Sequence, residues 1–298
     1  MTAAPLGYFP ASLSATLILA RQSSGPIETY LLRRSGKSAF MPGSYVFPGG
    51  RVDADDIDVD FWQAHMDLPA DRLSLALDGP LERRLPLAVA AIRETWEEAG
   101  LLLASPNGHS AGMPPRTSEP PVFSQWIQAL DLRLCLSRLG RWSRWVTPQV
   151  LRHRFNTYFF LAAVEDGETC QPDGREVVDG LWITPLAALA RNLAGTLPLS
   201  PPTLVTLHQL LAHDDLEGLV ERTRRQPWPP VILPRWLPLE EGAIIIEPWD
   251  PAYGDPHITI DLDRMENDLL PVGAPFSRLW IHKGHCRPVK SRPEACIC

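Results

Sequence analysis

Hydrophobic and polar positions alternate along several short stretches of this chain and recur at helical spacing in others. The two-residue alternation predicts β-strands at residues 12–20, 28–34, 46–50, 142–147, 155–164 and 177–183, with further strand-like runs at 243–246 and 257–260. Spacings of three and four residues predict helices at 61–66, 87–99, 122–132, 185–192, 203–213 and 216–225. Helices and strands do not alternate regularly, which favours the α+β class or a β-sandwich with helices outside.

The predicted helix 87–99 has an apolar side and a charged side. At about 100° per residue, the apolar side gathers Leu85, Val89, Ile92 and Trp96. Pro86 fits the first helical position, and Gly100 fits the left-handed residue just after the end of a helix. The pattern therefore predicts a short helix that packs on the rest of the protein through its apolar face and leaves its charged face accessible.

The charged side of this helix carries Glu94, Glu97 and Glu98 on adjacent turns. Three carboxylates so close together repel one another, and a hard divalent cation such as Mg²⁺ or Mn²⁺ relieves that repulsion because it prefers oxygen ligands. A solvated acidic face or a partner-binding surface would carry the same charges. Neither alternative explains the paired Gly49 and Gly50 upstream.

The run Arg93-Glu94-Thr95-Trp96-Glu97-Glu98-Ala99-Gly100-Leu101 resembles the second half of the Nudix box. That motif reads Gly, five residues, Glu, seven residues, Arg-Glu, an apolar residue, any residue, Glu-Glu, any residue, Gly, apolar. Its upstream half is similar to Phe47-Pro48-Gly49-Gly50. The resemblance implies a Nudix hydrolase and the Nudix fold, a mixed β-sheet sandwiched between α-helices.

The resemblance is interrupted between Gly50 and Arg93, where this chain carries about 29 residues more than the motif. The early Glu of the motif would fall on Leu85, so Glu82 or Asp53 would have to replace it. The peroxisomal coenzyme A diphosphatase subgroup is interrupted at this place. Segments 40–50, 142–148, 154–160 and 176–182 also resemble that subgroup, and the similarity covers residues 13–215.

The resemblance implies roles for the residues that match the box. Glu94, Glu97 and Glu98 would hold the metal ion, together with a backbone carbonyl near Gly50. Glu94 is our first choice for the general base, and Glu97 shares the catalytic role. The absent side chains of the paired glycines let backbone approach a metal or a phosphate.

Other positions extend this predicted site. Glu176, before the strand at 177–183, is our second choice for the base, although a plain surface glutamate would look the same. Arg33 and Arg34 end a predicted strand, and with Gly49 they are candidates to contact the phosphates of the substrate.

Two box residues have structural roles by the same resemblance. Arg93 would pair with a box glutamate and hold the loop in place, and Gly100 would end the helix.

The chain divides into a predicted Nudix domain at 10–215 and a C-terminal extension at 216–298 with partly strand-like sequence and no assigned role. Within the domain we expect an insertion at 53–84, forming a lobe or lid beside the site, and a flexible loop at 104–121, which is dense in Pro, Gly and Ser.

Composition narrows the class of protein. The 298 residues suffice for one large domain, and the net charge of −7 argues against a nucleic-acid partner. No run is long and apolar enough to predict a membrane span. Five scattered cysteines do not form a disulfide framework, which favours a reducing, cytoplasmic location. A homodimer is left open.

The predicted function is divalent-metal-dependent hydrolysis of the pyrophosphate bond in a nucleoside diphosphate linked to another moiety, with coenzyme A or acyl-coenzyme A as the best match. Other substrates that remain open are ADP-ribose, dinucleotides and nucleoside triphosphates. A non-catalytic nucleotide-binding module with the Nudix fold is the alternative from another class. The three helix glutamates favour the enzyme, whereas the missing early Glu favours the binding module.

Overall fold

A mixed β-sheet forms the centre of the protein. The structure, a computed structural model, describes residues 10–36, 41–105 and 122–291. Within these ranges, the main sheet comprises β1 (Ser12–Arg21), β2 (Glu28–Arg34), β3 (Tyr45–Val46), β4 (Gly49–Arg51), β7 (Gly140–Val146), β8 (Phe155–Ala163), β9 (Val177–Ile183) and β10 (Val231–Ile232). The strand order is β10-β7-β8-β1-β2-β3, with β4 paired to β1 and β9 paired to β2.

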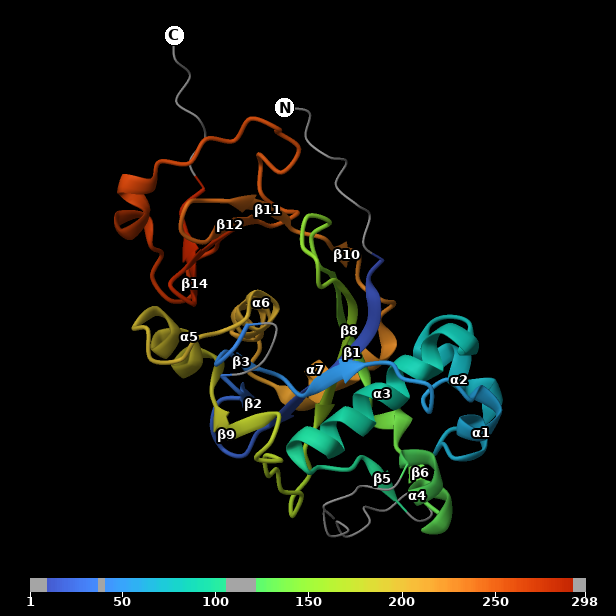
Figure 1. Cartoon of the computed structure of the whole chain (residues 1–298). Helices are drawn as coiled ribbons and strands as arrows, with labels where there is room; N and C mark the ends of the chain where they lie inside the picture. The colour runs from blue at the N-terminus through green and yellow to red at the C-terminus, as the bar shows by residue number, and fades with distance from the viewer. Residues whose placement is uncertain (1–9, 37–40, 106–121, 292–298) are drawn as a thin grey trace.

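Helices cover both faces of this sheet (Figure 1). One face carries α1 (Val59–Ala64), α2 (Ala70–Leu77), α3 (Leu81–Ala99) and α4 (Phe123–Ala129), together with the short ribbon of β5 (Ala104–Ser105) and β6 (Arg133–Leu134). The other carries α5 (Pro185–Leu193), α6 (Pro201–Leu210) and α7 (Leu216–Arg225). This layering confirms the predicted α+β class and the mixed sheet between helices. No helix in the described ranges is both long enough and apolar enough to cross a membrane.

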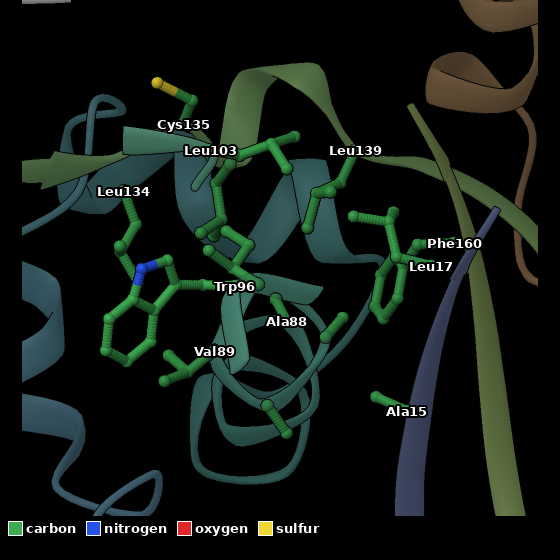
Figure 2. Close-up of a cluster of buried hydrophobic side chains, with 14 of the residues drawn as sticks. Ala15, Leu17, Ala88, Val89, Trp96, Leu103, Leu134, Cys135, Leu139 and Phe160 are labelled. Atoms are coloured by element: carbon green, nitrogen blue, oxygen red, sulfur yellow. The ribbon is translucent and has the colours of Figure 1, made fainter. Parts of the chain in front are cut away.

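Strand β1 separates two hydrophobic cores because its side chains alternate between the faces of the sheet. Leu17 and Leu19 face the first core, under α3, whereas Ile18 and Ala20 face the second, under α5 to α7. Figure 2 shows the first core, where Leu17 and its neighbour Phe160 on β8 lie close to α3. Strands β1 and β8 run parallel, and β2 and β4 pair antiparallel with β1, which brings Gly49 and Gly50 beside the middle of the sheet.

The insertion at 53–84 forms a packed lobe, because α1, α2 and the start of α3 bury Trp62, Met66, Leu73 and Leu77 in the first core. Arg141 on β7 fastens this lobe to the rest of the chain. Its guanidinium donates to the carbonyls of Leu75 and Ala76 at the end of α2, and to those of Arg224 and Gln226 at the end of α7.

The C-terminal extension is partly continuous with the main sheet. Helix α7 packs its apolar side into the second core, and β10 pairs with β7. Beyond it, a second sheet contains β11 (Arg235–Pro238), β12 (Ala243–Ile246), β13 (Arg278–His282) and β14 (His285–Val289), in that order. In the described ranges, 3-10 helices lie at Leu136–Arg138 and Leu262–Asp268. The second sheet lies beyond α5 and α6 in Figure 1.

Two of the predicted elements need correction. Helix α3 begins at Leu81, so Pro86 lies in the helix interior and not at its first position. The proline removes one helical hydrogen bond, and burial of the run from Leu85 to Ile92 against the first core keeps the helix continuous through it. Residues 257–260 form no strand, because Ile258 and Ile260 pack on a small core without a neighbouring strand to pair with.

The other two differences concern the lobe and the predicted loop. Residues 70–77 form α2, which the pattern did not predict. The predicted flexible loop at 104–121 begins as β5, and its remaining residues, 106–121, lie outside the described ranges.

Candidate active site

A buried arginine organises the carboxylates of α3. The guanidinium of Arg93 is largely buried, and its Nη1 donates to Glu94 Oε1 and to Glu97 Oε2, at 3.0 Å each. Its Nε and Nη2 donate to the two oxygens of Asp56 at 2.9 and 2.8 Å, and Nη2 also donates to the Arg51 carbonyl at 2.9 Å. Helix α3 supplies the spacing, because residues 93 and 97 are one turn apart.

The third glutamate points to the glycine pair. Glu98 is buried, and its Oε2 accepts a hydrogen bond from the backbone N–H of Gly49 at 2.9 Å. A Cβ at Gly49 would overlap the Ala15 carbonyl on β1, so this position requires glycine for close approach. The predicted contact of Gly49 with a phosphate would compete with Glu98 for the same N–H.

Gly50 lies directly against Glu94. A Cβ at Gly50 would overlap the Glu94 carboxylate. We therefore expect Gly50→Ala to displace Glu94 and to lower the hydrolysis rate by on the order of 10²-fold, because small displacements of reacting groups are costly. Gly25→Ala is the matched control, since a Cβ there meets nothing within 4 Å. Steady-state rates and thermal unfolding of both variants check this, and unaltered turnover in Gly50→Ala would contradict it.

Burial raises the pKa values of the helix glutamates. The pKa of Glu94 is raised to about 7 and that of Glu98 to about 8, in both cases chiefly by burial. Burial also raises the pKa of Glu97, whose side chain is more exposed. For Arg93, burial alone would lower the pKa, but the hydrogen bonds that its guanidinium donates to Asp56 and the charges of Glu94, Asp56 and Glu97 raise it. The arginine is therefore charged, and it forms ion pairs with the carboxylates of Asp56, Glu94 and Glu97.

Glu176 lies near the end of α3, as part of a loop that caps this helix. The backbone N–H groups of Gln171 and Asp173 donate to the last carbonyls of the helix, at Ala99 and Glu98. Asp173 in turn accepts from the N–H of Glu176 at 3.1 Å. The charge of exposed Glu176 contributes to the raised pKa of Glu98, so the structure brings this predicted residue close to the box.

The two candidate arginines lie on opposite faces of β2. Arg34 continues the face of Tyr30 and Leu32, which α3 covers, and its charge acts on Glu98 by lowering its pKa. Arg33 faces the second core and acts on Tyr45. Only Arg34 therefore lies with the glutamates of α3.

Gly100 ends α3 in the left-handed conformation, with φ of +70°, as predicted from its position. Its N–H donates to the Trp96 carbonyl at 3.0 Å.

The donor set fits a hard divalent cation by its chemistry, since it consists of crowded, buried carboxylates. Nη1 of Arg93 bridges one oxygen of Glu94 and one of Glu97. The positive charge of the guanidinium therefore offsets part of the repulsion between these two carboxylates. Among the described residues, no three His, Cys, Asp or Glu side chains are gathered in a geometry that would hold a metal ion.

One cavity among the described residues lies away from the glutamates of α3. Its volume is about 240 Å³, and it is lined by Glu266, Trp280, His282, Lys283, His285 and Arg287 of the C-terminal extension. None of these residues belongs to the predicted site.

Asp56 is the site residue that sequence reasoning missed. Leu85, the position of the early Glu, is fully buried in the first core and cannot hold a charge. Glu82 is exposed near the start of α3, and Asp53 approaches Arg93 only to 3.8 Å. The signal available in the sequence was the spacing of the motif counted forward from Gly50, which places the early Glu at position 56; counting back from Arg93 across the insertion gave Leu85 instead.

Comparisons with known proteins identify related sequences and a related structure. The family model described as the NUDT19 Nudix domain matches residues 12–210. The acyl-coenzyme A diphosphatase NUDT19 of Gallus gallus is 29% identical, with 89% of this chain and 86% of the relative covered. That of Homo sapiens is 28% identical, covering 86% and 81%. The crystal structure of a NUDIX hydrolase from Alicyclobacillus acidocaldarius aligns with a TM-score of 0.60 at 27% identity, over 74% of this chain and 99% of that one.

Proposed function

Because the chain belongs to the NUDT19 Nudix domain family, we propose that it hydrolyses the pyrophosphate bond of coenzyme A or an acyl-coenzyme A with the help of Mg²⁺ or Mn²⁺. The products are an adenosine bisphosphate and a phosphopantetheine, acylated where the substrate is. The observation that carries the proposal is the similarity to acyl-coenzyme A diphosphatases over more than four fifths of their length. The intact glutamates of α3 beside Gly49 and Gly50 support it.

Hydrolysis requires that water attack one phosphorus atom while the bond to the bridging oxygen breaks. Bound at Glu94, Glu97 and Glu98, the cation would neutralise charge on the phosphate oxygens and leaving group. Glu94 is our first choice for the general base, because it matches the glutamate that follows the arginine of the box and its carboxylate lies directly against Gly50. Arg34, on the same face, is the candidate contact for a substrate phosphate.

The test is cleavage by the purified full chain with Mg²⁺ or Mn²⁺, read by mass spectrometry. The panel holds coenzyme A, acyl-coenzyme A, ADP-ribose, NADH, diadenosine polyphosphates and nucleoside triphosphates. We expect release of 3′,5′-adenosine bisphosphate from coenzyme A or its acyl forms. Cleavage of another compound alone would replace the substrate, and no cleavage of any compound, with metal bound, would favour a binding module.

Two further properties are part of the proposal. Cys135, Cys170 and Cys286 are free thiols in the described ranges, which supports a cytoplasmic location; Cys296 and Cys298 lie outside those ranges. Fractionation of cells that express the tagged full chain tests this location. A homodimer stays a prediction that sedimentation of the purified protein can check.

A further inference from the structure

We infer that the cavity in the C-terminal extension is a second binding site, which takes a small molecule that bears a phosphate group. The β-hairpin of β13 and β14 forms it together with the 3-10 helix at Leu262–Asp268. The matching family model ends at residue 210 and therefore assigns no role to this hairpin. The site is separate from the carboxylates of α3 and does not depend on the reaction proposed above.

The turn of the hairpin sets which side chains face the cavity. Residues 283–284 form this two-residue turn with φ of +47° and +77°, a conformation that matches the twist of the flanking strands. In the resulting register, His282 lies opposite His285, and Trp280 lies opposite Arg287. Because side chains alternate between the faces of a strand, these four residues share one face, and all four line the cavity.

The cavity carries positive charge in a protein whose net charge is −7. Lys283 and Arg287 are the permanent cations of its lining, and Glu266 is the acid. The side chain of Glu266 is 66% exposed and lies 4.0 Å from Arg287 Nη1, so water screens this pair. Glu241 lies 3.3 Å from the ring of His282, but its side chain is 74% exposed and is screened in the same way. These acids therefore leave the positive charge of the cavity largely available to a ligand.

Polar atoms of the lining residues lack partners within the protein. Among the described residues, Arg287 Nε, Trp280 Nε1 and His285 Nδ1 are buried atoms without a hydrogen-bond partner. Buried polar groups in folded proteins nearly always have a partner, so such atoms indicate a bound water or a ligand. The N–H groups of Arg287 and Trp280 are donors, and an anion with several acceptor oxygens would satisfy them.

The size and the charge of the cavity select the class of ligand. Its volume of about 240 Å³ equals the space of about eight water molecules at liquid density. Pockets for drug-sized ligands begin at about 300 Å³, so the cavity suits a phosphate group with a short remainder and not a whole nucleotide. A phosphate monoester carries a charge of about −1.5 to −2 at neutral pH, which matches one ammonium and one guanidinium. The same two cations repel a metal ion, and no metal-binding cluster occurs among the described residues.

The experiment measures binding of inorganic phosphate, glycerol 3-phosphate and acetate by isothermal titration calorimetry, using the full chain freed of metal with EDTA. We expect saturable binding of a phosphate compound at one site per chain and weaker binding of acetate. NMR signals of ¹³C-labelled histidine rings locate the site, because a ligand at the hairpin shifts the signals of His282 and His285. Tighter binding of glycerol 3-phosphate identifies a phosphate ester as the ligand, whereas equal or tighter binding of inorganic phosphate identifies the free anion.

Three variants make the test specific. Arg287→Gln should weaken phosphate binding by roughly 10-fold, because a charged hydrogen-bond donor is lost. Lys283→Gln should weaken it by about 3-fold, since this lysine is exposed. Lys290→Gln is the matched control, because it removes the same charge from an exposed lysine just after β14 that is not part of the lining. It should change the affinity by less than about 1.5-fold, because salt screens distant charges.

Opposite results overturn the inference. Without saturable phosphate binding by wild type, the cavity is not a phosphate site. Binding that leaves the signals of His282 and His285 unchanged, or that neither Arg287→Gln nor Lys283→Gln weakens, takes place elsewhere on the chain. Tighter binding of acetate than of both phosphate compounds would contradict the ligand class. Circular dichroism reports whether each variant is folded, and if Arg287→Gln is not, the comparison of Lys283→Gln with Lys290→Gln decides.

Discussion

Glu98→Gln is expected to abolish metal-dependent hydrolysis, lowering the rate by on the order of 10³-fold, while the fold stays intact. The substitution removes one charge from the predicted metal shell without changing the shape of the side chain. The amide oxygen can still accept the hydrogen bond from Gly49, which Glu98 accepts at 2.9 Å. Because burial raises the pKa of Glu98 to about 8, a neutral side chain at this position does not destabilise the folded state.

The measurement compares turnover, Mn²⁺ binding and thermal unfolding of Glu98→Gln, Glu97→Gln and wild type. Glu217→Gln is the control, because it exchanges an exposed glutamate in the first turn of α7 for the same amide. Glu97→Gln should lose activity as Glu98→Gln does. Full activity in either variant would remove that residue from the metal-ligand assignment.

Glu247→Gln is expected to stabilise the protein at pH 8 by on the order of 4 kcal/mol. Glu247 follows β12 and is completely buried, and neither of its carboxylate oxygens has a hydrogen-bond partner among the described residues. Burial raises the pKa of its carboxyl to about 8, and its charge acts on the buried thiol of Cys286. An ionised glutamate here is costly, whereas the amide stays neutral at every pH.

The sign of this effect depends on pH. Below pH 4.5, the ordinary value, Glu247 is protonated in both the folded and the unfolded state, so ionisation costs the folded state nothing. Between pH 4.5 and about 8 the unfolded state ionises first, and the folded state loses stability steadily as the pH rises. Above about pH 8 the carboxyl is ionised in both states, so the loss of folding stability no longer changes with pH.

Urea unfolding of wild type and Glu247→Gln at pH 5 and pH 8 checks this prediction. The two proteins should differ little at pH 5 and clearly at pH 8. Glu240→Gln, an exposed position in the same extension, should show no such dependence. A stability difference between wild type and Glu247→Gln that does not change with pH would show that Glu247 is not buried as a free carboxyl.

Local sequence patterns were enough to predict the bounds of those helices and strands that are specified by the hydrophobic pattern of their own residues. The bounds of β2, β9 and α7 match their predictions, because two-residue alternation and helical spacing extend to the ends of these segments. The start of α3 did not follow from local pattern. Pro86 indicates a helix start, and only packing of the lobe against the first core explains why the helix begins at Leu81.

The predicted site likewise has features that follow from local sequence and features that depend on the tertiary fold. Glu94, Glu97 and Glu98 share one helix, so their proximity follows from helix geometry alone. Alternation along β2 already placed Arg33 and Arg34 on opposite faces, but which face α3 covers was decided by the order of the strands.

The sequence by itself determined the mixed fold, the carboxylate helix, its end at Gly100 and the need for glycine at positions 49 and 50. Those features arise from contacts between residues near each other in the chain or from a motif of fixed spacing. Only the tertiary structure decided that Glu247 is buried without a hydrogen-bond partner among the described residues, and that the insertion packs as a lobe. Each of these depends on segments far apart in the chain, and burial of a charge becomes visible only when the surrounding surfaces are in place.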